Sequence, residues 1–344
     1  MDASPIYSPP PPPSIASAFE LALAIAAERR GATAPNPTVG CVLLDKAGQS
    51  LAAAAHQRAG EGHAEVNALA QCREAGTMER IRTAIVTLEP CNHWGRTPPC
   101  VEALLRAPVR TVWIGAGDPN ANASGGAARL AAAGIEVCVI DAASPLGVQC
   151  AELIAPFAKR QATGRPWVTV KQALDPVGSM IPPQGRTTFT SQSALTYAHR
   201  LRRRADAILT GSGTVLADDP AFTVRHVADH GGKRRPLAVL DRRGRVPDSW
   251  LKAAATRGLD AYRATNLEAA LDELGRRGAM EVLVEAGPGL SEAVLQSGFW
   301  DEHVLIRQAS PETAPGRLET VEVHRRDPAR TECFTFEESE CSPA

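Results

Sequence analysis

The sequence predicts an α/β protein with two domains: a three-layer α/β/α domain over residues 14–158 and a second α/β domain over residues 167–325. Segments with the patterns of strands and helices alternate along most of the chain, which favours sheets covered by helices. A polar stretch, AKRQATGRP, separates the halves and predicts a linker at 159–166. The length of 344 residues suits two domains of ordinary size.

The composition narrows the class of protein. A hydrophobic fraction of 44% and a charged fraction of 22% are ordinary for a globular protein. The net charge of -1 gives no reason to expect DNA or RNA as a partner. No apolar run approaches the roughly 20 residues that span a bilayer, and the start, MDASPIYSPPPPPS, lacks the pattern of a secretory signal. We therefore expect a cytoplasmic protein without a membrane or nucleic-acid partner.

Each element of the first domain has a local signal. The proline-rich residues 1–13 predict a disordered tail. The following segment, SAFELALAIAAERRG, predicts a helix that begins with a capping box of Ser17 and Glu20 and ends at Gly31. The later segments predict a strand at 39–45, a helix at 62–76, a strand at 81–90, a helix at 101–108, a strand at 110–119, and a helix and strand within 128–140.

The second domain repeats the alternation. The predicted elements are a strand at 167–174, a helix at 190–206, a strand and glycine-rich loop at 206–220, a strand at 235–241, a helix at 266–278, a strand, glycine turn and helix at 280–298, and a strand at 301–309. Residues 326–344 form an acidic tail to which we assign no structure.

Three side chains in the first domain have the chemistry of zinc ligands. His63 opens a predicted helix, Cys91 follows a predicted strand, and Cys100 comes shortly after. Eight cysteines in a chain without an export signal favour metal binding or buried thiols over disulfides. Three protein ligands leave one tetrahedral position of zinc open for water. Glu65, two residues beyond His63, could take a proton from that water and pass it to a leaving nitrogen.

Two points about this predicted zinc site remain open. A structural zinc site would need a fourth protein ligand, for which His93 is the nearest candidate. That arrangement would leave Glu65 without a role, so we favour the open site. His56 could approach the zinc site or lie at the surface.

Zinc deaminases carry an H-x-E and a P-C-x-x-C motif. Here eight residues separate Cys91 from Cys100, and PNPTVG, HAE, TLEPC and GRTPPC follow one another in the first domain. This set resembles the deaminase half of the bifunctional riboflavin-biosynthesis family, whose domain is cytidine-deaminase-like. The resemblance implies that His63, Cys91 and Cys100 bind zinc, that Glu65 is the catalytic proton carrier, and that Asn36 holds the pyrimidine ring. Asn92 stands where the family usually has serine.

The second domain lacks a G-x-G-x-x-G fingerprint. Two glycine-bearing segments, TGSGTVLADDP and VEAGPGLSEA, instead resemble the reductase half of the same family, whose fold is similar to dihydrofolate reductase and whose cofactor is NADPH. By that resemblance the cofactor would contact Thr214, Asp218, Gly287, Pro288, Gly289, Leu290, Ser291, Glu292 and Ala293. The ribosyl-phosphate substrate would contact Arg202, Phe222, Arg225 and Glu285.

The reductase half also departs from the family pattern. QALDPVGSMIPP replaces a serine-leucine-aspartate-glycine turn after Lys171, Thr188 stands where a tryptophan is usual, and the region after 308 is shortened. A deaminase with a degenerate reductase domain therefore remains an alternative. So do a deaminase acting on another base and a non-catalytic, zinc-stabilised nucleotide-binding protein.

The resemblance as a whole gives the function that we expect. The first half would deaminate 2,5-diamino-6-(5-phosphoribosylamino)pyrimidin-4(3H)-one by zinc-dependent hydrolysis. The second half would then reduce the ribosyl side chain with NADPH. The family also implies a homo-oligomer, either a dimer or a tetramer.

Overall fold

The chain divides into two compact units, residues 1–163 and 164–344. The structure is a computed structural model, and the residues it describes are 10–94, 98–182, 185, 188–310, 317–326 and 331–337. The division falls within the predicted linker 159–166, although helix α5 continues to Thr163. The predicted disordered tail lies mostly outside the described residues.

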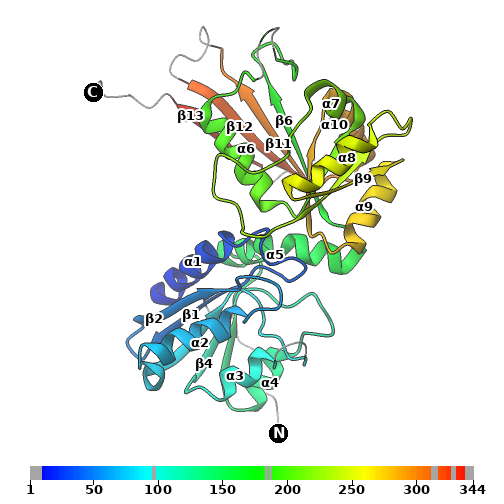
Figure 1. The fold of residues 1–344 in the computed structure, drawn as a ribbon. Helices are drawn as coiled ribbons and strands as arrows, with labels where there is room; N and C mark the ends of the chain where they lie inside the picture. The colour runs from blue at the N-terminus through cyan, green and yellow to red at the C-terminus, as the bar shows by residue number, and fades with distance from the viewer. Residues whose placement is uncertain are drawn as a thin grey trace. The chain divides into compact units, whose positions relative to one another are not determined.

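A five-stranded mixed sheet forms the centre of the first unit, in the order β2-β1-β3-β4-β5 (Figure 1). Strand β1 pairs antiparallel with β2 and β3, and β3, β4 and β5 run parallel. The strands are β1 (Gly40–Asp45), β2 (Ser50–Ala55), β3 (Ile81–Val86), β4 (Thr111–Ile114) and β5 (Glu136–Val139).

Helices cover both faces of this sheet, so the predicted three layers are confirmed. The helices are α1 (Pro13–Ala27), α2 (Ala64–Glu74), α3 (Cys100–Leu105), α4 (Gly126–Ala132) and α5 (Pro145–Thr163). Side chains of β1 alternate between two cores: Cys41 and Leu43 pack with α2, α3 and α4, whereas Val42 and Leu44 pack with α1 and α5.

Three local predictions in the first unit were wrong or incomplete. Helix α1 begins at Pro13, so Ser17 and Glu20 lie inside it and form no capping box; a proline at the first helical position needs no amide partner. The alanine-rich strand β2 was missed because alanine has no intrinsic preference for strands. Helix α5 was missed because Pro156 interrupts its sequence pattern.

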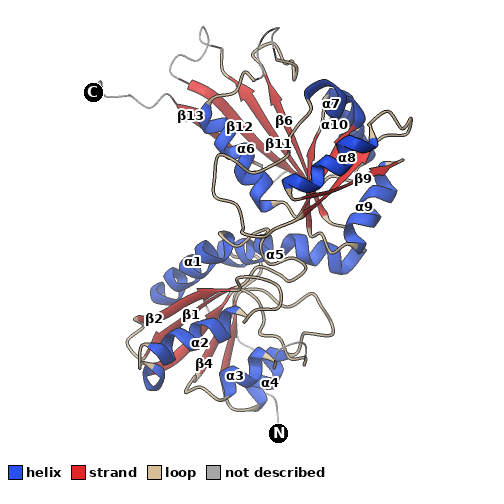
Figure 2. Ribbon diagram, viewed as in Figure 1, coloured by secondary structure: helices blue, strands red, loops and turns tan. Residues whose placement is uncertain are grey.

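The second unit is also an α/β layer structure, as predicted (Figure 2). Its eight-stranded sheet has the order β13-β12-β11-β6-β10-β7-β8-β9, with β12 antiparallel to its two neighbours and the other pairs parallel. The strands are β6 (Trp167–Leu174), β7 (Ala207–Gly211), β8 (Arg235–Leu240), β9 (Leu259–Ala264), β10 (Glu281–Glu285), β11 (Glu302–Gln308), β12 (Arg317–Arg325) and β13 (Glu332–Glu337).

Helices of this unit pack on the two faces of its sheet. They are α6 (Gln192–Arg204), α7 (Ser212–Asp218), α8 (Asp248–Ala254), α9 (Leu267–Arg276) and α10 (Pro288–Ser297). The predicted glycine-rich loop after β7 is largely helix α7, and most of the predicted glycine turn is the start of α10. Sequence patterns missed α8, β9, β12 and β13, the last of which lies in the predicted acidic tail.

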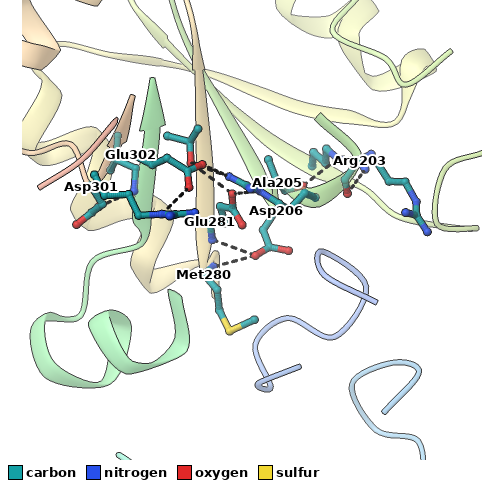
Figure 3. Close-up of polar contacts among 12 residues, drawn as sticks. Arg203, Ala205, Asp206, Met280, Glu281, Asp301 and Glu302 are labelled. Carbon is teal, nitrogen blue, oxygen red and sulfur yellow. Dashed lines mark hydrogen bonds and ion pairs between the residues drawn. The ribbon is translucent and has the colours of Figure 1, made fainter. Parts of the chain in front are cut away.

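A buried polar network holds together the strand starts of the second unit (Figure 3). The Asp206 carboxylate accepts hydrogen bonds from the backbone N–H groups of Met280 and Glu281, over 3.1 and 3.0 Å. Arg204 forms ion pairs with Glu281 and Glu302. These contacts fix the ends of the strands that lie opposite the predicted cofactor site. Within the described residues, every helix is too short or too polar to traverse a bilayer.

Candidate functional site

The structure brings the three predicted zinc ligands of the first unit together. His63 is the N-cap residue of α2, Cys91 lies in the loop after β3, and Cys100 is the first residue of α3. The His63 Nδ1 atom lies 3.5 Å from Cys91 Sγ and 3.2 Å from Cys100 Sγ. All three ligand atoms lie within 4.8 Å of one another. One imidazole and two thiols at this spacing fit a tetrahedral zinc ion.

The loop that carries Cys91 is fixed by Glu89. One oxygen of the Glu89 carboxylate accepts the N–H groups of Gly125 and Ala127 at the start of α4, each over 3.0 Å. A carboxylate at a helix N-terminus satisfies free amide groups and interacts favourably with the helix dipole. Glu89 therefore ties the segment before Cys91 to α4. Residues 95–97 of the quoted GRTPP motif lie outside the described residues.

The two thiols differ strongly in proton affinity. A hydrogen bond from Cys100 lowers the pKa of Cys91 to about 4, and His63 acts in the same direction. The same hydrogen bond, together with burial, raises the pKa of Cys100 well above its usual value. The hydrogen bond to Cys91 raises the pKa of His63. The pair thus favours one thiolate, the form in which cysteine binds zinc.

Glu65 lies in the first turn of α2 with only 3% of its surface exposed. Burial raises the pKa of its carboxyl group, and the charge of His63 partly offsets this effect. It is not one of the three clustered ligands. A buried carboxyl group with a raised pKa beside a metal-ligand cluster is a candidate proton carrier.

Asn36 lies beside the ligand cluster through a contact that sequence reasoning did not predict. Its side-chain Nδ2 is 3.2 Å from His56 Nε2, and His56 Nδ1 is 3.0 Å from the Gly62 carbonyl oxygen. Because a carbonyl only accepts, Nδ1 carries the proton and Nε2 accepts from Asn36. The His56 and His63 rings meet edge to face at 5.2 Å.

The structure resolves the open question about His56. His56 is 2% exposed, and burial lowers the pKa of its ring, which favours the neutral form. The sequence could have indicated this burial through the position of His56 directly after β2, but that strand was not predicted. His93, the candidate fourth ligand, is exposed and does not join the cluster among the described residues. This geometry favours an open zinc site.

In the second unit, Arg202 and Glu285 meet as a buried pair. Arg202 donates from Nε and Nη2 to the two Glu285 oxygens, over 3.0 and 2.7 Å. Burial acts to raise the pKa of Glu285, but the charge and hydrogen bonds of Arg202 outweigh it and lower the pKa. A third bond, from Arg202 Nη1 to the Thr223 carbonyl oxygen, is 2.7 Å long. The guanidinium is therefore already bound to protein groups.

The loop after α7 places the two other predicted substrate residues. Phe222 is 4% exposed and has a φ of 53°, an uncommon conformation for a bulky side chain. The Arg225 backbone N–H donates to His199 Nδ1 over 2.9 Å, and its guanidinium reaches Thr223 Oγ1 over 2.9 Å. Thr223 thus connects the segments that carry Arg202 and Arg225.

The two predicted cofactor segments also meet. The Gly287 N–H donates to Thr214 Oγ1 over 2.9 Å, which joins the start of α10 to α7. A Cβ atom added at Gly213 or Gly289 would meet no other atom within 4 Å. Open space beside this backbone fits the close approach of a dinucleotide. Asp218 is exposed at the end of α7, and the structure shows no contact that defines its role.

The segment QALDPVGSMIPP, which departs from the family pattern, lines a cavity of about 410 Å³. One wall is formed by the end of β6 and the turn after it, and the other by α10. The lining residues are Gln172, Leu174, Gly178, Ser179, Met180, Ile181, Pro288, Glu292 and Leu295. Asp175 braces the turn, because its Oδ1 accepts the N–H groups of Val177 and Ser179 over 3.0 and 2.7 Å. The altered segment thus still forms a wall beside the predicted cofactor residues.

Two family models match the two units. The cytidine and deoxycytidylate deaminase zinc-binding region matches residues 14–116, and the RibD C-terminal domain matches residues 166–308. These matches agree with the placement of His63, Cys91 and Cys100 in the first unit and of the reductase-type fold in the second.

Full-length relatives cover most of the chain. A riboflavin biosynthesis protein RibD of Corynebacterium ammoniagenes is 37% identical over 302 residues, 88% of each chain. The RibD protein of Escherichia coli K12 is 36% identical and covers 83% of this chain and 84% of its own. These alignments include both units.

Solved structures with the same architecture include two enzymes of this type. An Acinetobacter baumannii RibD superposes with a TM-score of 0.73 at 33% identity, covering 86% of this chain and 87% of its own. A Thermotoga maritima diaminohydroxyphosphoribosylaminopyrimidine deaminase/5-amino-6-(5-phosphoribosylamino)uracil reductase gives a TM-score of 0.78 at 25% identity, covering 91% of this chain and 98% of its own.

Proposed function

Because this chain belongs to the RibD family of riboflavin biosynthesis proteins, we propose that it catalyses two consecutive reactions. The first is the hydrolytic deamination of 2,5-diamino-6-(5-phosphoribosylamino)pyrimidin-4(3H)-one. The second is the reduction of the ribosyl side chain by NADPH. The observation that carries the proposal is the His63, Cys91 and Cys100 cluster, with Glu65 buried beside it and outside the ligand set.

The deamination uses residues of the first unit in separate roles. His63, Cys91 and Cys100 would hold zinc, which would act as a Lewis acid and make water a better nucleophile at neutral pH. Glu65 takes a proton from the attacking water and delivers it to the amine nitrogen that leaves as ammonia. The raised pKa of Glu65 suits both halves of this transfer.

Asn36, oriented by His56, would hold the pyrimidine ring. Because Nε2 of this His56 tautomer accepts a hydrogen bond, it orients the Asn36 amide with its nitrogen toward His56. The carbonyl oxygen of that amide is then available to accept a hydrogen bond from a ring N–H or amino group. This arrangement orients the ring without adding a charge to the site.

The reduction takes place in the second unit. The segments joined by the Gly287 N–H and Thr214 Oγ1, at the starts of α10 and α7, would hold NADPH, which would supply a hydride. Glu285 holds Arg202 in one orientation through two hydrogen bonds. Arg225, whose guanidinium contacts only Thr223 among the contacts described, is better placed to reach a phosphate than Arg202.

Ammonia release and NADPH oxidation test the two halves separately. Purified protein is incubated with the pyrimidinone substrate, and ammonia is measured for this substrate, for cytidine and for an adenosine in RNA. We expect release from the pyrimidinone alone. Subsequent oxidation of NADPH would support the second step, whereas deamination without oxidation would leave a deaminase with an inactive second unit.

Membership of the family also suggests an oligomeric state and a cellular compartment for this protein. We propose a homo-oligomer, a dimer or tetramer, located in the cytoplasm and acting on a small molecule without a nucleic-acid or membrane partner. Light scattering of the purified protein would test the oligomeric state.

A further inference from the structure

Arg129 of α4 connects the two segments that carry the cysteine ligands. Its Nη1 donates to Asn92 Oδ1 over 3.0 Å, and its Nη2 donates to Glu102 Oε1. Asn92 directly follows Cys91, and Glu102 lies two residues after Cys100. One guanidinium therefore bridges the cysteine-bearing loop and the helix that begins with the other cysteine.

The backbone around Arg129 brings α4 against both segments. A Cβ atom added at Gly126 would lie 1.9 Å from the Pro90 carbonyl oxygen and 3.1 Å from Val101 Cγ2. Pro90 and Val101 are the residues next to Cys91 and Cys100. The Asn92 N–H also donates to the Ala123 carbonyl oxygen over 2.9 Å. The segments that carry Cys91 and Cys100 thus both pack against the first turn of α4.

We propose that Arg129 is a positioning residue for the zinc site, which fixes the separation of Cys91 and Cys100 by bridging Asn92 and Glu102. The planar guanidinium offers two donors at a fixed spacing, so it restrains both partners at once. Groups that orient metal ligands from behind commonly change metal affinity by about 10- to 100-fold when they are removed. The inference rests on the zinc site proposed above but not on its catalytic role.

The Asn92 side chain is long enough to meet the Arg129 guanidinium. The Asn92 amide oxygen accepts from Arg129 Nη1 over 3.0 Å. The Arg129 side chain is 39% exposed, so an isolated ion pair with Glu102 would contribute little. Its effect is expected to come from joining two segments, and it should therefore be lost when either Asn92 or Arg129 is removed.

Zinc release measures this role directly. Wild-type protein and the Arg129→Met and Asn92→Ala variants are loaded with zinc, and transfer of zinc to an excess of a chromogenic chelator is followed. We expect each variant to release zinc about 10-fold faster or more than the wild type. The double variant should release it no faster than Arg129→Met alone, because both changes break the same bridge.

Arg106 provides a matched control. It approaches the other oxygen of Glu102 at 3.8 Å but has no contact with the Cys91 segment among the described interactions. Arg106→Met should release zinc at the wild-type rate. Thermal unfolding with and without zinc separates positioning from general stability: Arg129→Met should reduce the increase in Tm that zinc produces, rather than lower both values equally.

The outcomes are distinct. Equal zinc-release rates for the wild type, Arg129→Met and Arg106→Met would overturn the inference while leaving the zinc site intact. An equal loss of Tm with and without zinc would assign Arg129 a purely structural role and also overturn it. A wild-type protein that binds no zinc would refute the proposed function itself, together with this inference.

Discussion

The backbone N–H of Cys100 donates a hydrogen bond to Cys91 Sγ over 3.3 Å. This contact places the sulfur of one ligand against the first amide of the helix that carries the other. Such an amide stabilises negative charge, so it favours the Cys91 thiolate. The start of α3 therefore helps to position Cys91 beside Cys100.

Replacing Glu65 should separate zinc binding from catalysis. Glu65→Gln keeps the size of the side chain but removes its proton-accepting carboxylate, so deamination should slow by about 100-fold or more. Zinc content, measured by atomic absorption, should stay at the wild-type level because Glu65 is not a ligand. A variant that retains full ammonia release would refute the proton-carrier role.

Loss of one cysteine ligand should lower zinc content. Cys100→Ser replaces a buried thiol of the cluster, whereas Cys333→Ser changes an exposed thiol on β13. We expect Cys100→Ser to lose bound zinc and ammonia release together, and Cys333→Ser to keep both. Equal zinc content in the two variants would contradict the ligand assignment.

Removing one member of the buried Arg202–Glu285 pair should destabilise the second unit more than replacing both. Arg202→Met leaves a buried carboxylate without its partner and should cost about 3–5 kcal/mol in the free energy of unfolding. Arg202→Met combined with Glu285→Leu should recover most of that loss in urea titrations. Both variants should lose NADPH oxidation, because neither retains the oriented pair.

Acid should destabilise the second unit through His199. Burial lowers its pKa to about 4, and Arg202, His226 and Arg225 add to the effect, while Glu285 opposes it. Below pH 6.5 the unfolded chain binds a proton that the folded protein does not, so stability is present at pH 7 and falls toward pH 4. The loss from this group should be on the order of 1–2 kcal/mol at pH 5.

His199→Asn tests this pH dependence. Asparagine offers an oxygen that can accept the Arg225 N–H but does not titrate. The difference in unfolding free energy between pH 7 and pH 5 should therefore be smaller in the variant than in the wild type. An unchanged difference would show that His199 is not the responsible group.

Sequence patterns predicted the division into two α/β domains and the residues of the ligand cluster because both depend on local signals. The H-A-E and P-C motifs lie at the ends of regular elements, and the glycine at the end of α2 has the expected positive φ, 65° at Gly76. Strands with weak local patterns, which depend on pairing with a distant segment, were missed. Strand β2 consists mainly of alanine, and it exists because β1 pairs with it.

The supporting residues of the site were the hardest to predict. Arg129 is far in sequence from Asn92, and His56, although close in sequence to His63, is 20 residues from Asn36; both contacts form only after folding. The predicted phosphate role of Arg202 depends on contacts as well: sequence gives its charge but not its two bonds to Glu285. The sequence around these residues does not indicate which groups they contact in the folded protein.

The most direct test of the account is analysis of the products formed from the pyrimidinone substrate and NADPH by purified protein. We predict that ammonia is released first, that one NADPH is oxidised for each ammonia, and that the final product carries a ribityl side chain. With Glu65→Gln, NADPH oxidation should fall with ammonia release but return when the deaminated intermediate is supplied. Absence of ammonia release from the zinc-loaded wild-type protein would contradict the central claim.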